Sequence, residues 1–155
     1  MVAPVYKIVI SKSQLQLRLF KNDQLLLSAP VSLGRPETPT PTGSFKVSKA
    51  VTKDSWLHQQ YRRWRNVWPK ISTLANIVKK VSFIYRRLSG KTDAVGEILF
   101  VLSDTAGKYI KEGIHGGLTD FSQPGYNTNG CIRLNRRDLL PLKDIPINTP
   151  VLIQD

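Results

Sequence analysis

The sequence has few of the side chains that form cross-links or bind metals. Its 155 residues include one cysteine, Cys131, and two histidines, His58 and His115. A single cysteine cannot form an internal disulfide bond. These three side chains are also too few for a standard zinc site built from cysteine and histidine ligands. His58 lies among Gln and Arg residues, which is typical of a helix surface. Cys131 is therefore either a small buried apolar residue or a reactive group.

Long apolar runs are absent as well. No segment approaches the roughly 18 consecutive apolar residues that a membrane-spanning helix needs. The N-terminal stretch reads MVAPVYKIVISK, which lacks the long apolar core and the small-residue cleavage site of a signal peptide. We therefore expect one domain with its own core, and any export to use a removed signal or another route.

Acidic residues are scarce, and the imbalance is concentrated in one segment. The chain has 23 Lys and Arg against 11 Asp and Glu, a net charge of +12. Residues 49–92 hold eleven of the basic residues and one acid, Asp54, so this segment carries +10 and the remainder +2. This boundary indicates a basic insertion in a nearly neutral scaffold.

The insertion has helical periodicity. Pro69 separates two groups of apolar residues, and Gly90 is a plausible helix stop. Residues three or four apart lie on one face of a helix, so the spacing predicts two amphipathic helices forming a hairpin. The apolar positions are Trp56, Tyr61, Trp64 and Trp68, then Ile71, Leu74, Val78, Val81, Tyr85 and Leu88.

Outside the insertion the pattern is that of strands. Residues 5–34 alternate apolar and polar side chains and are interrupted by polar turns at 11–13 and 21–23, which predicts an antiparallel meander ending in a strand over 25–33. The proline-rich residues 35–43 cannot form a central strand. Further short strands are expected near 45–47, 98–102, 109–110 and 151–153, so the fold should be mainly β.

The stretch that contains Cys131 is rich in glycine. Residues 113–135 read GIHGGLTDFSQPGYNTNGCIRLN, and His115 lies 16 residues before Cys131. A thiol attacks only as a thiolate, which requires a nearby base or a favourable electric field. The Gly, Pro and Asn residues between the two allow the chain to turn back, and main-chain N–H groups near Cys131 could hold an oxyanion. From residue types alone, a reactive pair and a buried structural cysteine both remain open.

These residues resemble the catalytic domain of bacterial L,D-transpeptidases, the cysteine enzymes of peptidoglycan. The resemblance covers about residues 5–48 and 94–153 and omits the basic insertion. It is carried by His115-Gly116, by Thr128-Asn129-Gly130-Cys131-Ile132-Arg133, and upstream by Gly34 and Thr40-Pro41-Thr42-Gly43 before Phe45. Two separated motifs in the right order make it specific.

The resemblance implies roles for the central residues. Cys131 would be the nucleophile and His115 the base, and the main-chain carbonyl of Gly116 would orient the imidazole. The N–H groups of Asn129, Gly130 and Cys131 would form the oxyanion hole. The motif has a second histidine where this chain has Asn129, and an amide cannot carry a proton at neutral pH. His115 would then perform all of the acid–base chemistry.

Three further positions have implied or structural roles. Thr128 and Arg133 match motif positions that shape the site or contact substrate. Arg133 could pair with a substrate carboxylate, or it could be an internal hydrogen-bonding anchor. Asn135 and Asp138 are typical of a helix N-cap followed by an acidic residue in the first turn.

The implied fold is a mainly β, L,D-transpeptidase-type β-sandwich of mixed sheets, one domain over residues 1–155, with 49–92 as a lid or cap. The implied reaction is attack on the carbonyl at the L-centre of the diamino acid in a peptidoglycan stem peptide. Terminal D-alanine would leave, and an amine or water would take the acyl group. An L,D-carboxypeptidase of the same fold, and a non-catalytic basic module binding an anionic surface or nucleic acid, remain alternatives.

The same resemblance bears on ligands and location. It implies no metal and no organic cofactor. The expected partners are stem peptides and, through the insertion, an anionic envelope surface, and nucleic acid is not expected. The expected location is the cell envelope, although this sequence shows no export signal.

Overall fold

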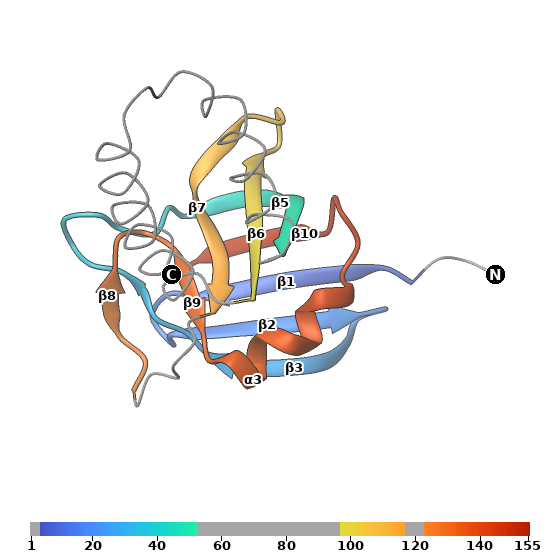
Figure 1. Cartoon of the computed structure of the whole chain (residues 1–155), viewed down its shortest axis with the longest axis horizontal. Coiled ribbons are helices and arrows are strands. Elements are labelled where there is room, and N and C mark those ends of the chain that lie inside the picture. Colours follow the sequence, from blue (N-terminus) through green and yellow to red (C-terminus); the bar gives the residue numbers. More distant parts are fainter. Residues whose placement is uncertain (1–3, 53–96, 117–122) are drawn as a thin grey trace, which may run out of the picture.

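A computed structural model describes residues 4–52, 97–116 and 123–155. The fold is mainly β, as predicted. An eight-stranded mixed sheet has the order β3-β2-β1-β10-β5-β6-β7-β9, and a two-stranded sheet pairs β4 with β8 (Figure 1). The strands are β1 (Tyr6–Ser11), β2 (Gln16–Lys21), β3 (Gln24–Pro30), β4 (Leu33–Gly34), β5 (Gly43–Thr52), β6 (Ile98–Asp104), β7 (Tyr109–Gly116), β8 (Tyr126–Thr128), β9 (Ile132–Leu134) and β10 (Pro150–Gln154).

The first three strands form the predicted antiparallel meander. Leu17 of β2 pairs with Ile10 of β1, and both side chains are fully buried. The strand expected over 25–33, however, is interrupted. β3 ends at Pro30. Ser32, two residues later, pairs with Arg133 instead, through two main-chain hydrogen bonds of 2.9 Å, one in each direction. β4 then pairs with β8 instead of β2, which brings the start of the proline-rich loop to the stretch before Cys131.

The last strand lies in the middle of the sheet. β10 runs parallel to β1 on one side and antiparallel to β5 on the other. Val151 and Ile153 point into the core from this position, next to Ile8 and Ile10 of β1. β10 therefore joins the N-terminal meander to the β5-β6-β7 meander.

β5 corrects the predicted start of the insertion. The strand continues to Thr52, and Ala50 and Val51 pair with Phe100 and Leu99 of β6. Residues 49–52 therefore belong to the sheet, because Val51 helps to fill the core that Phe100 occupies. The rest of the insertion, including the predicted helical hairpin and His58, lies outside the described residues.

The C-terminal part closes the core. β7 extends from Tyr109 to Gly116, longer than the predicted strand, and pairs in parallel with β9. A short helix, α3 (Arg136–Leu139), follows Asn135 as its N-cap and leads into the 3-10 turn η2 (Leu140–Asp144). Asp138 lies in the first turn as expected, but the Asn135 side chain makes no capping hydrogen bond. Across the described ranges, no helix has the length and apolarity needed to cross a membrane.

Candidate active site

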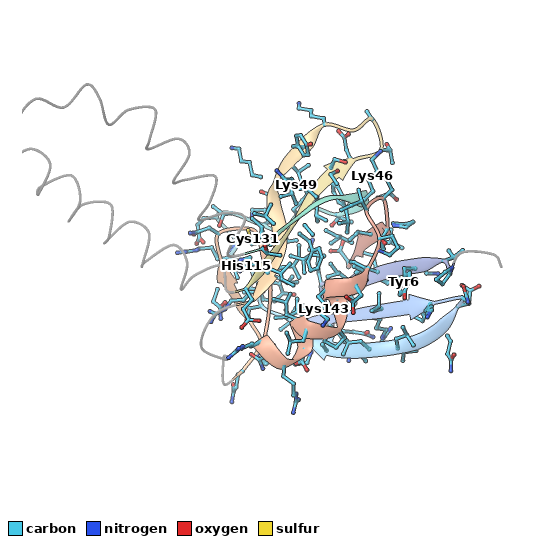
Figure 2. All side chains as sticks on the ribbon, turned by 45° about the vertical axis from the view of Figure 1, so that its right-hand side comes forward. Tyr6, Lys46, Lys49, His115, Cys131 and Lys143 are labelled. Carbon is cyan, nitrogen blue, oxygen red and sulfur yellow. The ribbon has the colours of Figure 1, made fainter. Side chains whose placement is uncertain are left out.

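The parallel pairing of β7 and β9 brings His115 and Cys131 to one face of the sheet. Ile114 pairs with Ile132, and both are fully buried in the core. Side chains alternate along a strand, so His115 and its neighbour on β9, Arg133, face the opposite side. Cys131 precedes Ile132 and contacts the backbone of Gly113, two residues before His115. Figure 2 shows Cys131 and His115 next to each other at these neighbouring strands. Residues 16 apart in sequence thus converge on one surface.

His115 is held in one tautomer by its own strand. Its Nδ1 lies 3.3 Å from the carbonyl oxygen of Gly116, the next residue. A carbonyl only accepts hydrogen bonds, so Nδ1 carries the proton and Nε2 keeps its lone pair. Burial lowers the pKa of His115, the Gly116 hydrogen bond raises it less, and the positive charge of Arg133 lowers it further. The imidazole is therefore neutral at pH 7.

Cys131 is half-buried, and its pKa is shifted in the opposite direction. Burial raises the pKa of the thiol, a hydrogen bond from the Gly113 backbone lowers it, and the carboxylate of Glu112 raises it. Together with the lowered pKa of His115, these effects make the uncharged thiol and uncharged imidazole the resting pair. A thiolate then forms only when a base accepts the thiol proton.

The loop before Cys131 is fixed by hydrogen bonds of its own. Thr128 Oγ1 donates to the carbonyl oxygen of Cys131 at 2.7 Å, and it accepts the N–H of Gly130 at 3.2 Å. Gly130 has φ +110°, and a Cβ there would lie 3.0 Å from Cγ of Glu112. Glycine is thus required at this position. The Gly130 N–H, expected in an oxyanion hole, is already bonded within the loop.

The upstream motif lies directly against this loop. Thr40 is buried, and its Oγ1 accepts the N–H of Gly34 at 2.9 Å and donates to the carbonyl oxygen of Gly130 at 2.8 Å. A Cβ on Gly34 would lie 2.8 Å from Cα of Gly130. The two separated motifs therefore form one structural unit around Cys131, a contact that their order in the sequence does not reveal.

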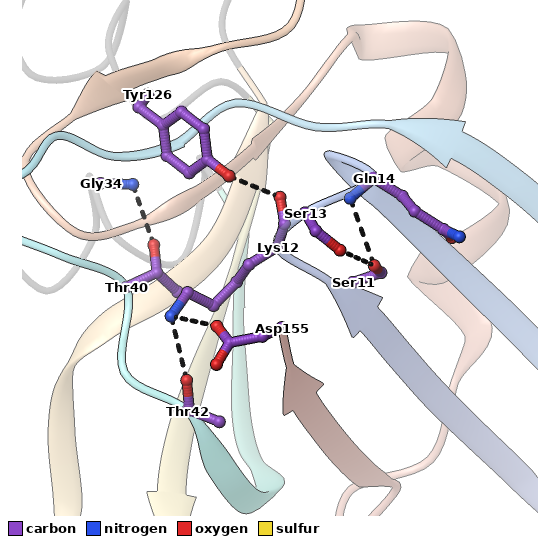
Figure 3. A network of polar contacts seen from close by, with 9 residues as sticks. All are labelled: Ser11, Lys12, Ser13, Gln14, Gly34, Thr40, Thr42, Tyr126 and Asp155. Carbon is purple, nitrogen blue, oxygen red and sulfur yellow. Dashed lines mark hydrogen bonds and ion pairs between the residues drawn. The ribbon is translucent and has the colours of Figure 1, made fainter.

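A second set of contacts anchors the other side of that unit. Lys12, after β1, pairs with Asp155 at 2.8 Å and donates to Thr42 Oγ1 at 3.0 Å (Figure 3). Tyr126 of β8 donates its hydroxyl to the Lys12 carbonyl at 2.7 Å. These bonds connect the loop around Thr40 to the ends of β1 and β10.

Arg35 was missed by the sequence analysis. It follows Gly34, and its Nη2 donates to Oδ1 of Asn129 at 2.6 Å. Its backbone N–H also bonds the carbonyl oxygen of Thr128 at 3.1 Å. A basic residue placed next to the motif glycine was the available signal. Among the described residues, no cluster of His, Cys, Asp and Glu could hold a metal ion.

These features agree with a comparison of the sequence with family models. The model of the L,D-transpeptidase catalytic domain (YkuD) matches residues 5–153, and the chain belongs to this family. Members of the family act on peptidoglycan peptides, generally outside the cytoplasm. No curated protein matches the sequence significantly.

Solved structures of L,D-transpeptidases share the fold. The enzyme from Mycobacterium smegmatis has a TM-score of 0.58 and 16% identity, with 99% of this chain covering 60% of that one. A cysteine-to-serine mutant from Enterococcus faecium has a TM-score of 0.59 and 17% identity, covering 96% and 49%. Mycobacterium tuberculosis L,D-transpeptidase 3, solved with a faropenem-derived adduct, has a TM-score of 0.56 and 18% identity, covering 99% and 61%. The chain thus spans about half to three-fifths of these proteins.

Proposed function

We propose that this chain is the catalytic domain of a cysteine L,D-transpeptidase with Cys131 as nucleophile and His115 as its base. The observation that carries the proposal is the register of β7 and β9, which brings the only thiol and a tautomer-fixed imidazole to one face. The Gly116 carbonyl holds Nδ1, so the free Nε2 is the atom that accepts the thiol proton. The expected substrate is a peptidoglycan stem peptide.

The acylation step follows from these groups. Nε2 of His115 takes the Cys131 proton while Sγ attacks the carbonyl carbon at the L-centre of the diamino acid. The bond to the terminal D-alanine then breaks, and His115 returns the proton to the leaving amine. This leaves a thioester on Cys131. An amine from another stem, a free D-amino acid, a protein lysine or water next attacks the thioester, and the thiol is restored.

The electrostatics support a proton shuttle in place of a permanent ion pair. An uncharged resting pair makes His115 a true general base, and the nearby charge of Arg133 makes the imidazolium a stronger acid for the leaving amine. We assign the oxyanion to the N–H groups of Asn129 and Cys131, because the Gly130 N–H already bonds Thr128. Arg133 thus lowers the pKa of His115, whether or not it also binds a substrate group.

The basic insertion gives the proposed enzyme a second contact. Its excess of Lys and Arg suits the anionic polymers and lipid headgroups of the cell envelope, where its substrate is found. We place its action in the envelope, outside the cytoplasm. Binding of the insertion to that surface would concentrate the catalytic domain near stem peptides.

The test is to incubate the protein with a disaccharide tetrapeptide and with a carbapenem, and to follow both by mass spectrometry. We expect loss of D-alanine from the peptide and a covalent carbapenem adduct on the protein. Cys131→Ala should abolish both, and because the chain has no other thiol, the loss assigns the adduct. Peptide conversion by Cys131→Ala at the normal rate, or no conversion and no adduct with the unaltered chain, would overturn the proposal.

A further inference from the structure

Arg35 lies against the residue that replaces the second motif histidine. Its Nη2 donates to Asn129 Oδ1 at 2.6 Å, and its Nε lies 3.4 Å from the carbonyl oxygen of Thr128. Thr38 Oγ1 reaches the same Thr128 carbonyl at 3.5 Å. The loop after β4 is thus attached to residues 128–129 by the side chain of Arg35 as well as by its backbone.

This contact fixes the direction of the Asn129 amide. A guanidinium only donates hydrogen bonds, so the atom of Asn129 that faces Arg35 must be the carbonyl oxygen. The NH₂ group therefore points away from Arg35. With Oδ1 engaged, Asn129 can meet a substrate as a hydrogen-bond donor, while a histidine at this position could have exchanged a proton.

Arg35 also retains charge and donors. Both Arg35 and Asn129 are exposed at this contact. Within residues 4–52, 97–116 and 123–155, no carboxylate forms an ion pair with Arg35, and its side-chain bonds through Nε and Nη2 leave the Nη1 hydrogens and one Nη2 hydrogen. Arginine binds carboxylates through two parallel N–H groups, which is the arrangement that such a free edge allows.

We propose that Arg35 is a specificity-determining residue, which orients Asn129 and binds a carboxylate of the acyl donor beside Cys131. The ligand class is a peptide with a free C-terminal carboxylate, the group carried by the D-alanine that would leave. The identity of this peptide rests on the proposed function, but the recognition of a carboxylate near the thiol does not.

The first experiment measures carboxylate recognition without any peptidoglycan. Iodoacetate and iodoacetamide alkylate thiols and differ by one negative charge, and Cys131 is the only thiol that they can modify. We expect Arg35→Gln to lower the ratio of the iodoacetate to the iodoacetamide rate about two- to fivefold at low salt, because a nearby cation attracts only the anionic reagent. Arg35→Lys should keep most of the ratio.

Arg18→Gln is the matched control. Arg18, on β2, also donates to side-chain amides, Gln14 Oε1 at 2.9 Å and Gln16 Oε1 at 2.8 Å, but β1, β10, β5 and β6 lie between β2 and β7 in the sheet order. Glu112 and Arg133 also lie near the Cys131–His115 pair, but they are unchanged in every variant, so they cannot cause a difference in the ratio between variants. An unchanged ratio in Arg35→Gln, or an equal change in Arg18→Gln, would overturn the proposal.

The second experiment extends the test to the peptide. For a tetrapeptide with a free C-terminal carboxylate we expect Arg35→Gln to raise KM about tenfold, and for its C-terminal amide to raise KM much less, because only the orientation of Asn129 is then lost. Equal losses on both peptides would show that Arg35 only supports the loop. If the unaltered enzyme converts neither peptide while the alkylation ratio still depends on Arg35, the proposed function fails and the carboxylate site stands.

Discussion

Thr40→Val tests whether the two motifs depend on each other. Valine has nearly the shape of threonine but no hydroxyl, so the substitution removes the bond from the Gly34 N–H and the bond to the Gly130 carbonyl without opening a cavity. Thr40 is 2% exposed, so water cannot easily replace the lost partner. The substitution therefore removes a hydrogen bond from the main chain of each motif, at Gly34 in the upstream motif and at Gly130 before Cys131.

The expected magnitude follows from these two bonds. Leaving a buried donor or acceptor without a partner costs about 1–3 kcal/mol for each group, so the two groups together should lower the free energy of unfolding by about 2–6 kcal/mol. For a domain of this size, 1 kcal/mol corresponds to roughly 2–4 °C in Tm, so Tm should fall by at least about 4 °C and by up to about 24 °C. Thiolate chemistry at Cys131 should also slow, because the Gly130 carbonyl loses its anchor.

The assay is thermal unfolding followed by circular dichroism, with carbapenem acylation measured well below Tm. Thr42→Val is the control, since Thr42 has the same hydroxyl two residues away but is exposed, and its partner among the described residues is the surface side chain of Lys12. We expect it to lower Tm by less than about 2 °C, within the usual range of surface substitutions. Equal shifts in the two variants would refute the view that Thr40 couples the motifs.

Three further predictions concern catalysis and the insertion. The pKa of His115 is lowered, so kcat/KM should be retained at neutral pH and lost only as the pH falls below about 6.5. If kcat/KM still rose with pH above about 6.5, the neutral resting pair would be contradicted. Asn129→Ala should reduce kcat/KM less than His115→Ala, which removes the base and should lower the rate by about 10²-fold or more; equal losses would show a proton-transfer role for Asn129. Binding to peptidoglycan sacculi should weaken steeply with added salt and when six basic residues become Gln, with adduct formation at Cys131 unchanged; binding that ignores both would exclude an electrostatic contact. The six are Arg62, Arg63, Lys79, Lys80, Arg86 and Arg87.

Local patterns predicted most of the sheet. The alternation in residues 5–34 placed β1 and β2 because each has one buried face, and Val151 to Ile153 were placed as a strand for the same reason. The division after Pro30 was not predictable, because Val31 and Leu33 continue the apolar alternation. What interrupts the strand is a main-chain pairing between Ser32 and Arg133, and partners so distant leave no local periodicity.

The sequence motif and the structure contribute different residues to the candidate site. The motif drew attention to Cys131 and His115, and the structure brings their strands together. Arg35 was missed because its contact to Asn129 spans 94 residues and depends on how the proline-rich loop folds over the nucleophile loop. The start of the insertion was wrong for a related reason: Lys49 is basic like the residues after it, but its backbone pairs with Val101 of β6. The change in charge shows where the composition changes, but the strand ends where its main-chain hydrogen bonds to β6 end.

Because β10 lies in the middle of the sheet but late in the sequence, it determines when the sheet can be completed during translation. The N-terminal meander and the β5-β6-β7 meander can each form early on the ribosome, since their neighbours in the sheet are also neighbours in the chain. Among the described residues, only β10 pairs with a strand of each meander, although the Ser32–Arg133 bridge and the β4–β8 pair also connect the two parts of the chain. A nascent chain that already contains both motifs would thus still lack the strand that joins the two meanders into one sheet, and β1 and β5 would each keep an unpaired edge. The eight-stranded sheet can form only after β10 has emerged, so a factor that binds exposed strand edges could act on the nascent chain until then.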